Sequence, residues 1–402
     1  MINVAVLGYG TVGSGVVEVI EKNKDMVNKK SAQELEVKYI LDLRDFPGDP
    51  YEDKVIHDFN TILHDDSVTI VCETMGGVGA AYQFTKQALE RGKSVCTSNK
   101  ELVAKHGPEL LQIAREHNCN YLFEASVGGG IPIIRPLNYS LTAEKIEAIN
   151  GILNGTTNYI LSKMEKEGAD FAAVLKEAQD KGYAERNPEA DVEGYDACRK
   201  IAILTSLVAG KTVDFHKIHT EGITGIDPTD FAYAKKLDAT IKLLAVSRET
   251  EDGYQISVAP YLLKKENALA GVNDVFNAVA VCGNTLGDTM FYGRGAGKLP
   301  TASAVVADVV ECARHLQKTV GCLWEEGEAK VADFDSQEGR FFVRVLKKAR
   351  ADVEKVFGAV VPVVLDSALE EFAFVTESMQ EAEFEKCREQ IFGFVKKIRI
   401  KD

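Results

Sequence analysis

The residue types best suited to chemistry lie close together in the middle of the chain. The segment AQDKGYAERNPEADVEGYDACRK, which ends at Lys200, is rich in carboxylates and amines. We expect one helix to end at its first glycine, a loop with Glu185 and Asp191 to follow, and a new helix to carry Asp196 and Lys200. Residues spaced i, i+4 lie on one face of a helix, so the last two side chains should meet.

Three carboxylates and one amine at such a place could hold the ammonium and hydroxyl groups of a small polar substrate. There is also a plainer interpretation. Asp196 and Lys200 would then form an ordinary helix ion pair, and Asp191 would cap the helix. The residues alone leave both interpretations open.

A second motif with clear chemistry opens the chain. The hexapeptide GYGTVG follows an apolar run and precedes a helical pattern. Its glycines suit a tight turn, a close approach of the backbone to a pyrophosphate, and close packing of helix on strand. The helix N-terminus adds free N–H groups for the anion. A plain strand–turn–helix connection is the alternative, but the position and the pattern that follows favour NAD or NADP. The expected cofactor-binding residues here are Gly8, Gly10, Thr11, Val12 and Gly13.

The choice between the two dinucleotides should be made at the end of the second strand. An acid there binds a ribose hydroxyl, and an arginine accommodates a 2′-phosphate. The sequence offers Asp42, Arg44 and Asp45. Arg44 favours NADP, unless it is only a solvated charge paired with Asp45, and an acid in contact with the ribose would favour NAD.

The first third of the chain must position this turn. Near-continuous apolar runs alternate with helical patterns, which is typical of a parallel sheet covered on both faces. We therefore predict a doubly wound, Rossmann-type α/β domain. The expected strands are Ile2–Leu7, Val37–Leu43, Val68–Thr74, Ser94–Thr97 and Tyr121–Ala125, and the expected helices are Val12–Lys22, Ala80–Arg91 and Glu109–His117.

The pattern changes after Pro132 to that of a mixed α+β domain. We expect strands at Ala148–Leu153, Tyr254–Leu262 and Ala278–Val281, and helices at Thr157–Glu167, Phe171–Lys181, Glu193–Ala209, Asp230–Ser247 and Ala302–Leu316. The last stretch looks independent, with the order βαββαβ of a ferredoxin-like domain. Its strands are expected at Arg340–Leu346, Val360–Leu365, Glu370–Thr376 and Phe392–Ile400, and its helices at Ala349–Phe357 and Glu381–Ile391.

Composition excludes several classes of function. The 402 residues carry a formal net charge of -14, which argues against nucleic acid and anionic membranes as partners. The sequence has no signal peptide and no apolar run long enough to span a membrane, so we predict a cytoplasmic protein. Its eight cysteines show no metal-ligand spacing, and its seven histidines form no recognisable catalytic set.

Several motifs together resemble one enzyme family. The pattern A-x3-G-Y-A-x2-N-P-x2-D-V-x-G-x-D-x3-K, which ends at Lys200, is similar to the signature of homoserine dehydrogenases. The family's other motifs follow in the expected order: GYGTVG, TSNK at 97–100, EASVGGGIP at 124–132, GILNGTTNYIL at 151–161 and GRGAGKLPTASAVVAD at 293–308. The resemblance covers roughly residues 1 to 320.

The resemblance implies oxidation of L-homoserine to L-aspartate 4-semialdehyde with NAD(P), or the reverse. Lys200 would donate a proton to the aldehyde oxygen, and Lys100 would be a second amine between cofactor and substrate. The implied substrate-binding residues are Glu185, Asp191, Asp196, Gly155 and Thr156. The implied contacts to the nicotinamide or its ribose are Thr74, Ser98, Lys100 and Gly295.

The family also binds a monovalent cation such as Na⁺ through backbone carbonyls. The resemblance places this ion at Glu124, Val127, Gly129 and Ile131. The alternative is a turn whose glycines only let two domains approach each other.

The resemblance further implies a domain plan. The NAD(P)-binding domain would span residues 1–131 with a returning segment at about 293–318, the catalytic and dimerisation domain 132–292, and an ACT-like domain 335–402. The aspartate and Pro-Gly turn usual after the first ACT strand are absent, because the chain there reads VLKKAR from Val345. Effector binding is therefore in doubt, and a role in a homodimer or homotetramer is the alternative.

Two rival functions stay open at this point. Cys96 lies in the sequence VCTSN, which could belong to a cysteine-dependent semialdehyde dehydrogenase. However, it falls inside a predicted buried strand without an evident histidine partner. The second rival is a sensor that binds NAD(P) without catalysis. It leaves the lysine and acid positions unexplained.

Overall fold

The computed structural model describes residues 1–368 and 370–401. Leu369 and Asp402, which fall inside the expected ACT-like domain, lie outside the described residues. The chain divides into two compact units. The first unit is Met1–Lys145, Ala202–Phe215 and Phe291–Ala329, and the second is Ile146–Ile201, His216–Met290 and Lys330–Asp402. The expected domain boundaries stay a prediction. None of the helices described is long and apolar enough to cross a membrane.

The first unit is built on a six-stranded sheet in the order β3-β2-β1-β4-β5-β6, with every neighbouring pair parallel. The order steps outward from β1 in both directions, which is the doubly wound arrangement expected from the sequence. The strands are β1 (Ile2–Leu7), β2 (Leu35–Leu41), β3 (Val55–Ile56), β4 (Val68–Glu73), β5 (Ser94–Thr97) and β6 (Tyr121–Leu122).

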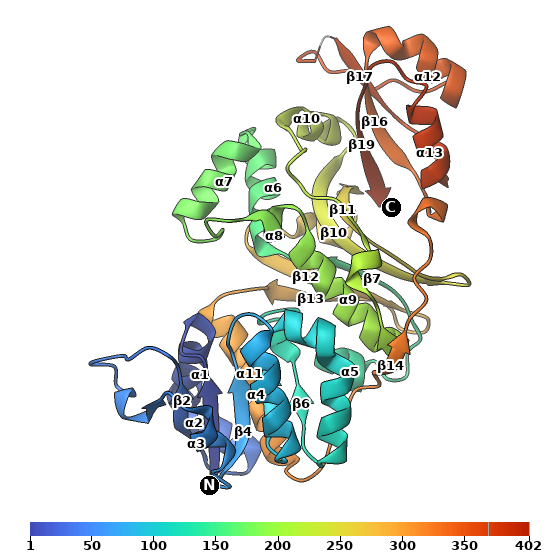
Figure 1. Cartoon of the computed structure of the whole chain (residues 1–402). Coiled ribbons are helices and arrows are strands. Elements are labelled where there is room, and N and C mark those ends of the chain that lie inside the picture. The colour runs from blue at the N-terminus through green and yellow to red at the C-terminus, as the bar shows by residue number, and fades with distance from the viewer. Residues whose placement is uncertain (369, 402) are drawn as a thin grey trace. The chain divides into compact units, whose positions relative to one another are not determined.

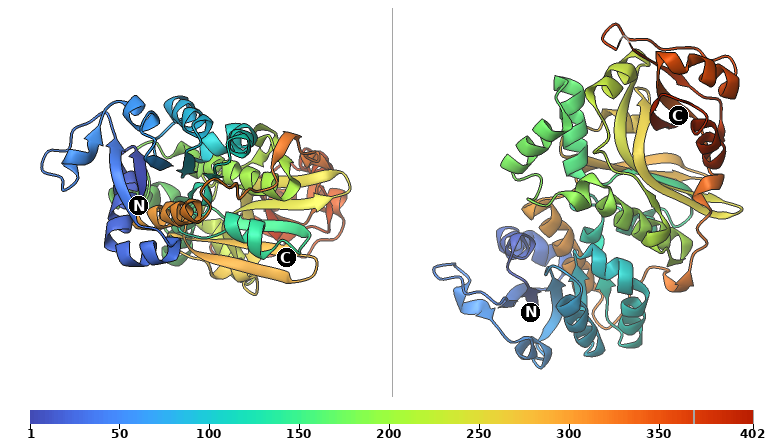
Figure 2. Two further views of the ribbon diagram at one scale, coloured as in Figure 1. Left: turned by 90° about the horizontal axis from the view of Figure 1, so that it is seen from below. Right: turned by 45° about the horizontal axis from the view of Figure 1, so that its top comes forward.

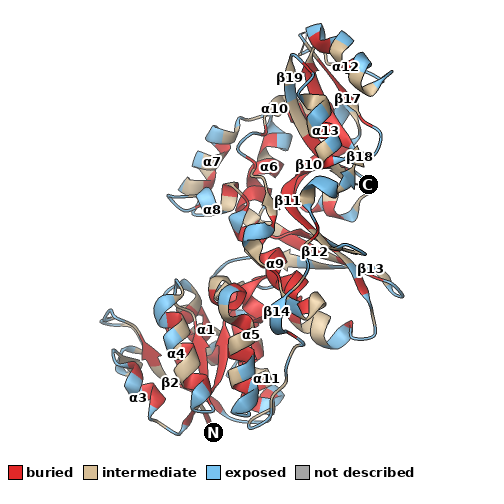
Figure 3. Ribbon diagram, turned by 45° about the vertical axis from the view of Figure 1, so that its right-hand side comes forward, coloured by how far each residue is buried: buried red, intermediate tan, exposed pale blue. Residues whose placement is uncertain are grey.

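Helices lie on both sides of this sheet (Figures 1 and 2). Helices α1, α2 and α11 share one apolar core with the central strands, whereas α4 and α5 pack against each other and against β4, β5 and β6. The strands are buried and the outer helix faces are exposed (Figure 3). The helices are α1 (Thr11–Lys22), α2 (Lys24–Ser31), α3 (Phe59–Leu63), α4 (Gly79–Glu90), α5 (Lys100–Glu116) and α11 (Lys298–Arg314).

The second unit is built on a nine-stranded mixed sheet. Eight strands follow the order β13-β12-β7-β10-β11-β19-β16-β17, and β9 pairs with β11 off this path. The strands are β7 (Ile146–Ile152), β9 (His219–Thr220), β10 (Ala239–Thr250), β11 (Gly253–Lys264), β12 (Phe276–Gly283), β13 (Gly287–Arg294), β16 (Phe341–Leu346), β17 (Glu371–Val375) and β19 (Phe394–Lys401). Helices α6 and α10 pack on β10. The helices are α6 (Gly155–Glu167), α7 (Phe171–Asp180), α8 (Glu189–Val192), α10 (Pro228–Lys236), α12 (Arg350–Phe357) and α13 (Glu381–Arg388). Helix α9 (Tyr195–Ala209) belongs to the second unit up to Ile201 and to the first unit from Ala202.

The expected helix Asp230–Ser247 is wrong. Helix α10 ends at Lys236, and the next segment is the long strand β10. Asp238 adopts a left-handed conformation (φ 50°) that separates the two elements. Residues 239–247 are all buried, so the strand shows no polar–apolar alternation that would distinguish it from a buried helix.

The C-terminal stretch does not form a sheet of its own. Strand β19 pairs in parallel with β11, with Tyr261 opposite Arg399, so this stretch extends the sheet of the second unit. The expected strand Val360–Leu365 is absent from the described residues except for one bridge between Val363 and Ala373. Val363 makes both backbone hydrogen bonds of this bridge with Ala373, at 2.6 and 2.8 Å.

Candidate active site

The turn after β1 has the geometry of a phosphate-binding loop. Gly8 has a φ of 89°, which favours glycine. A Cβ added at Gly13 would lie 1.8 Å from the carbonyl oxygen of Gly8, so no other residue fits there. A Cβ at Gly10, which directly precedes α1, would meet nothing within 4 Å. The turn therefore has open space at the start of the helix, where Thr11 and Val12 begin α1 and a pyrophosphate could approach the backbone.

A cavity of about 550 Å³ adjoins this turn. It has the size of a small-molecule site, and its lining combines apolar side chains with a few polar groups. The lining comprises Gly8, Gly10, Leu41, Asp42, Leu43, Arg44, His57, Phe59, Thr74, Met75, Gly76, Ala80 and Phe84. These residues fit the adenosine half of a dinucleotide.

Arg44 pairs with Asp42 at the edge of this cavity. Its Nε lies 2.9 Å from Asp42 Oδ1, and its Nη2 donates to Oδ2 at 3.0 Å. The backbone N–H of Tyr9 also donates to Oδ2, at 2.8 Å. These contacts, the Arg44 guanidinium foremost, hold the pKa of Asp42 well below its usual range. The alternative partner Asp45 instead lies 3.1 Å from His57.

Thr74 and Ser98 lie at the carboxyl ends of neighbouring parallel strands. The hydroxyl of Thr74 donates to the carbonyl oxygens of Leu7 and Gly8, each at 2.9 Å, and so fixes the glycine turn. The backbone N–H of Ser98 donates to the carbonyl of Glu73 at 3.4 Å. Such ends of parallel strands are where ligands bind in doubly wound sheets.

Lys100 is the first residue of α5, directly after its N-cap Asn99. The side chain of Asn99 accepts from the backbone N–H of Leu102. Lys100 belongs to the first unit, whereas Lys200 belongs to the second.

Lys200 is the centre of a buried polar cluster in the second unit. Its Nζ lies 2.8 Å from Asp196 Oδ2, one helical turn earlier on α9, and donates to the carbonyl oxygen of Leu153 at 2.8 Å. The two side chains are 11% and 6% exposed. The shared helix face predicted from the i, i+4 spacing is therefore confirmed, but this is no ordinary surface ion pair.

Asn154 connects this pair to the loop. Its Nδ2 donates to Asp191 Oδ1 at 2.7 Å and to Asp196 Oδ2 at 2.9 Å. Its Oδ1 accepts from the backbone N–H of Thr157 at 2.9 Å and caps α6. The sequence indicates the cap but gives no sign of the two carboxylate contacts, because Asp191 and Asp196 lie 37 and 42 residues away.

The remaining expected substrate residues surround the start of α6 and the loop after α7. The hydroxyl of Thr156 donates to the carbonyl of Tyr183 at 2.7 Å, which ties that loop to the helix. Glu185 is exposed, and its carbonyl accepts from Gln179 at 3.1 Å. A Cβ at Gly155 would lie 3.0 Å from a backbone carbonyl oxygen, so this position is crowded.

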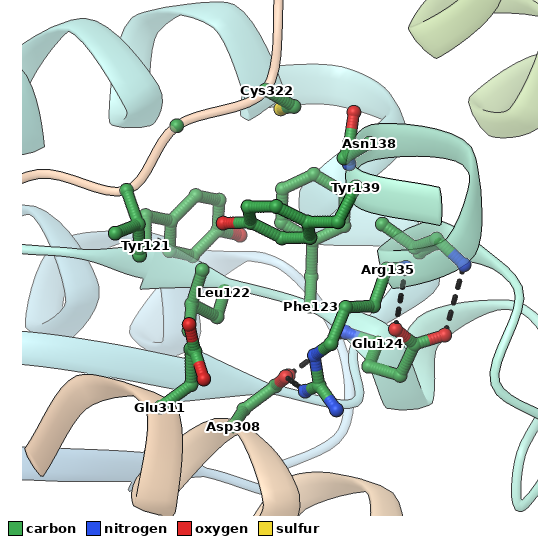
Figure 4. Close-up of a pocket in the computed structure, with 13 residues that line it drawn as sticks. Tyr121, Leu122, Phe123, Glu124, Arg135, Asn138, Tyr139, Asp308, Glu311 and Cys322 are labelled. Carbon is green, nitrogen blue, oxygen red and sulfur yellow. Dashed lines mark hydrogen bonds and ion pairs between the residues drawn. The ribbon is translucent and has the colours of Figure 1, made fainter. Parts of the chain in front are cut away.

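Glu124 organises the glycine-rich loop that follows β6. Its Oε1 accepts from the backbone N–H groups of Ile133 and Ile134, at 2.7 and 2.9 Å, and its Oε2 accepts from that of Arg135 at 2.7 Å. Its own N–H donates to Asp308, which also pairs with the Arg135 side chain (Figure 4). The cavity beside these residues holds about 30 Å³, room for one water. Because both carboxylate oxygens are engaged, a cation at this loop would have to be held by carbonyl oxygens.

Gly129 brings the same loop against the returning segment. It has a φ of 56°, and a Cβ there would lie 2.2 Å from the carbonyl oxygen of Gly295. Val127 and Ile131 are buried on either side of it. No cluster of three or more histidine, cysteine or acidic side chains with metal-ligand geometry occurs in the part of the chain that the structure describes.

Cys96 does not suit a nucleophile. It is fully buried in β5, and its Sγ lies 3.6 Å from that of Cys312. Burial raises the pKa of the thiol well above its usual value, so the reactive thiolate is disfavoured.

The fold and these sites together define a dinucleotide-dependent oxidoreductase. Two family models match the chain: "Homoserine dehydrogenase, NAD binding domain" at residues 8–124 and "Homoserine dehydrogenase" at residues 132–310. The chain therefore belongs to the homoserine dehydrogenase family, as its motifs predicted.

Individual relatives agree with this assignment. A homoserine dehydrogenase of Bacillus subtilis is 38% identical over 408 residues, covering 95% of this chain and 93% of its own. The crystal structure of a homoserine dehydrogenase from Thiobacillus denitrificans has a TM-score of 0.91 at 33% identity, covering 100% of this chain and 98% of that one. A hyperthermophilic archaeal homoserine dehydrogenase in complex with NADPH has a TM-score of 0.65 at 28% identity, covering 77% and 97%.

Proposed function

We propose that the protein interconverts L-homoserine and L-aspartate 4-semialdehyde with NADP or NAD. The observation that carries this proposal is the buried pair of Lys200 and Asp196, joined by Asn154 to Asp191. The test is a steady-state assay of purified protein with L-homoserine and each dinucleotide. If homoserine is oxidised with neither NAD nor NADP, the proposal is contradicted.

Lys200 would move the proton of the reaction. A nicotinamide dinucleotide, when bound, supplies the hydride during reduction. The ammonium of Lys200 has three N–H groups, and its contacts to Asp196 and Leu153 account for two of them. The third can donate to the aldehyde oxygen, where negative charge develops as the alcohol forms. Asp196 orients the ammonium and keeps its charge balanced in this buried place.

The acids of the loop would bind the amino-acid end of the substrate. Asp191 and Glu185 suit its ammonium group, and the N–H groups of Gly155 and Thr156 in the first turn of α6 suit its carboxylate. Lys100, at the start of α5, would contribute a second positive charge between cofactor and substrate.

The choice of dinucleotide would depend on Arg44. Its guanidinium is well exposed beside the adenosine cavity, and Asp42 is its partner in the structure. A 2′-phosphate could take the place of Asp42 as a bidentate partner, which favours NADP. Thr74, Ser98 and Gly295 would lie toward the nicotinamide end. The archaeal homoserine dehydrogenase of known structure holds NADPH, which supports the same choice.

A monovalent cation would be held by the carbonyl oxygens of Glu124, Val127, Gly129 and Ile131, since the Glu124 carboxylate is engaged elsewhere. We further propose that residues 335–402 serve as an ACT-like domain in a homodimer or homotetramer. All eight cysteines are free, which suits a reducing compartment such as the cytoplasm.

A further inference from the structure

Glu73 is a buried carboxylate at the end of β4, close to the sites described above but not among them. Its Oε2 accepts from the Thr97 hydroxyl at 2.6 Å, and its Oε1 accepts from the backbone N–H of Met75 at 2.8 Å. The residue has no measurable exposure. Burying a carboxylate costs free energy, so its retention calls for a reason beyond packing.

The contacts of Glu73 continue into the next turn. Thr97 ends β5, and its hydroxyl oxygen accepts from the backbone N–H of Asn99 at 2.9 Å. Asn99 caps α5 by accepting from Leu102, and its Nδ2 donates back across to the carbonyl of Gly77 at 2.7 Å. The turn after β4 and the turn after β5 are therefore tied together by side chains from both.

We propose that Glu73 is a positioning residue for the reaction: through Thr97 and Asn99 it holds turns 74–77 and 98–100 in the geometry that receives the dinucleotide and presents Lys100. This inference rests on the proposed roles of Thr74, Ser98 and Lys100. We name the set formed by Glu73, Thr97 and Asn99 the strand-end clamp.

The clamp fits the ionised form of Glu73. The Thr97 hydroxyl and the Met75 N–H point donors at the carboxylate, and a proton on either oxygen would compete with one of them. The Asn99 side chain also favours the charged form. Burial raises the pKa of Glu73 to about 7, although these donors oppose that rise. Burial, and to a lesser extent the charge of Glu73, raises the pKa of the Tyr121 phenol on β6 well above its usual value.

Four variants test the clamp with matched pairs. Thr97→Val keeps the shape but removes the hydroxyl, Thr97→Ser keeps the hydroxyl, and Glu73→Gln keeps the size but removes the charge. Thr69→Val is the control, because Thr69 lies on the same strand β4 and its hydroxyl has no hydrogen-bond partner among the described residues. Circular dichroism first establishes which variants are folded. For those variants, dissociation constants for NADPH and NADH are measured by fluorescence, and kcat and KM are measured for L-homoserine.

We expect Thr97→Val and Glu73→Gln to weaken dinucleotide binding and to lower kcat, each roughly tenfold, because small misplacements in a site are costly. Thr97→Ser and Thr69→Val should stay within about twofold of the parent. Unchanged dinucleotide binding in both Thr97→Val and Glu73→Gln would overturn the proposal, as would an equal loss in Thr97→Ser and Thr97→Val. If Glu73→Gln does not fold, the comparison of Thr97→Val with Thr97→Ser decides the test. A fully active Lys100→Ala variant would refute the proposed role of Lys100 in the reaction. It would not refute the clamp, because the clamp is tested by dinucleotide binding.

Discussion

The Lys200 ammonium and the Asp196 carboxylate lie 2.8 Å apart on one face of α9, and both are almost completely buried. Two charges in such a place are costly unless each is further hydrogen-bonded. Here Leu153 O accepts from the lysine and Asn154 donates to the aspartate. The pair is therefore satisfied as a charged unit, and Asn154 connects it to Asp191 in the preceding short helix α8.

Replacing Lys200 by alanine should strongly slow the reduction of aspartate 4-semialdehyde while dinucleotide binding stays intact. General acid catalysis contributes about 10²- to 10⁴-fold, and we expect a loss in that range. NADPH binding, measured by fluorescence, should not change, because Lys200 does not line the cavity beside the glycine turn where we expect the dinucleotide to bind. The exposed Lys176 on α7 offers a matched Lys→Ala control. Activity of Lys200→Ala within a few-fold of the parent would refute the proposed role.

Asn154→Asp should separate the capping role of this residue from its role in the site. Aspartate keeps an oxygen for the Thr157 N–H but puts a third carboxylate against Asp191 and Asp196. We expect an intact fold with kcat/KM for homoserine lowered at least about tenfold by like-charge repulsion. Asn154→Ala removes the cap of α6 as well, so its free energy of unfolding should fall by about 1 kcal/mol, as measured by urea unfolding. An Asn154→Asp variant as active as the parent would show that the amide contacts are dispensable.

The sequence predicted five of the six strands of the first unit, because these strands are buried on both faces and read as short apolar runs between helices. The short strand β3 and the helices α2 and α3 were not predicted. The same property led to the wrong prediction of a helix at β10, because residues 239–247 are buried throughout and resemble the buried part of a helix. The pairing of β19 with β11 could not be foreseen, because 138 residues separate the paired positions, such as Tyr261 and Arg399. Strand pairing over such a distance leaves no local pattern in the sequence.

The site was predictable where its contacts are local. The spacing of Asp196 and Lys200 sets their meeting directly. In contrast, the contact of Asn154 with Asp191 depends on how two distant segments fold together. Glu73 was missed because an acid at the end of an apolar run normally marks where a strand reaches solvent, whereas here it is buried among donors.

Arg44→Ala should reduce the use of NADP more than that of NAD. A charge-assisted contact to a phosphate contributes about 1.5 to 3 kcal/mol, so kcat/KM with NADP should fall roughly 10- to 100-fold. The value with NAD should hold or rise, because Asp42 loses its partner and can accept from ribose hydroxyls. Parallel assays with both dinucleotides measure the ratio. An equal fall with both would mean that Arg44 does not discriminate between them.

Iodoacetamide should not inactivate the native enzyme within minutes by reaction at Cys96. The thiol is fully buried and its pKa is raised well above the usual value, so little thiolate is present or accessible. Residual activity over time, with the modified cysteines identified by mass spectrometry, measures this. Rapid inactivation that homoserine or NADP prevents, with the label on Cys96, would instead favour a cysteine mechanism.

The buried carboxyl of Glu73 should make stability depend on pH. Burial raises its pKa from 4.5 to about 7 in the folded protein. Between these values the folded state keeps a proton that the unfolded chain has lost, so its contribution to stability falls as pH rises through this window and levels off above it. Glu73→Gln removes this contribution. Relative to the parent, the variant should therefore gain roughly 2 to 3 kcal/mol between about pH 4.5 and pH 8. Urea unfolding at several pH values measures the difference, with Glu90→Gln on the exposed face of α4 as the control. A parent and a Glu73→Gln variant whose stabilities change in parallel with pH would show that this carboxyl does not titrate in that window.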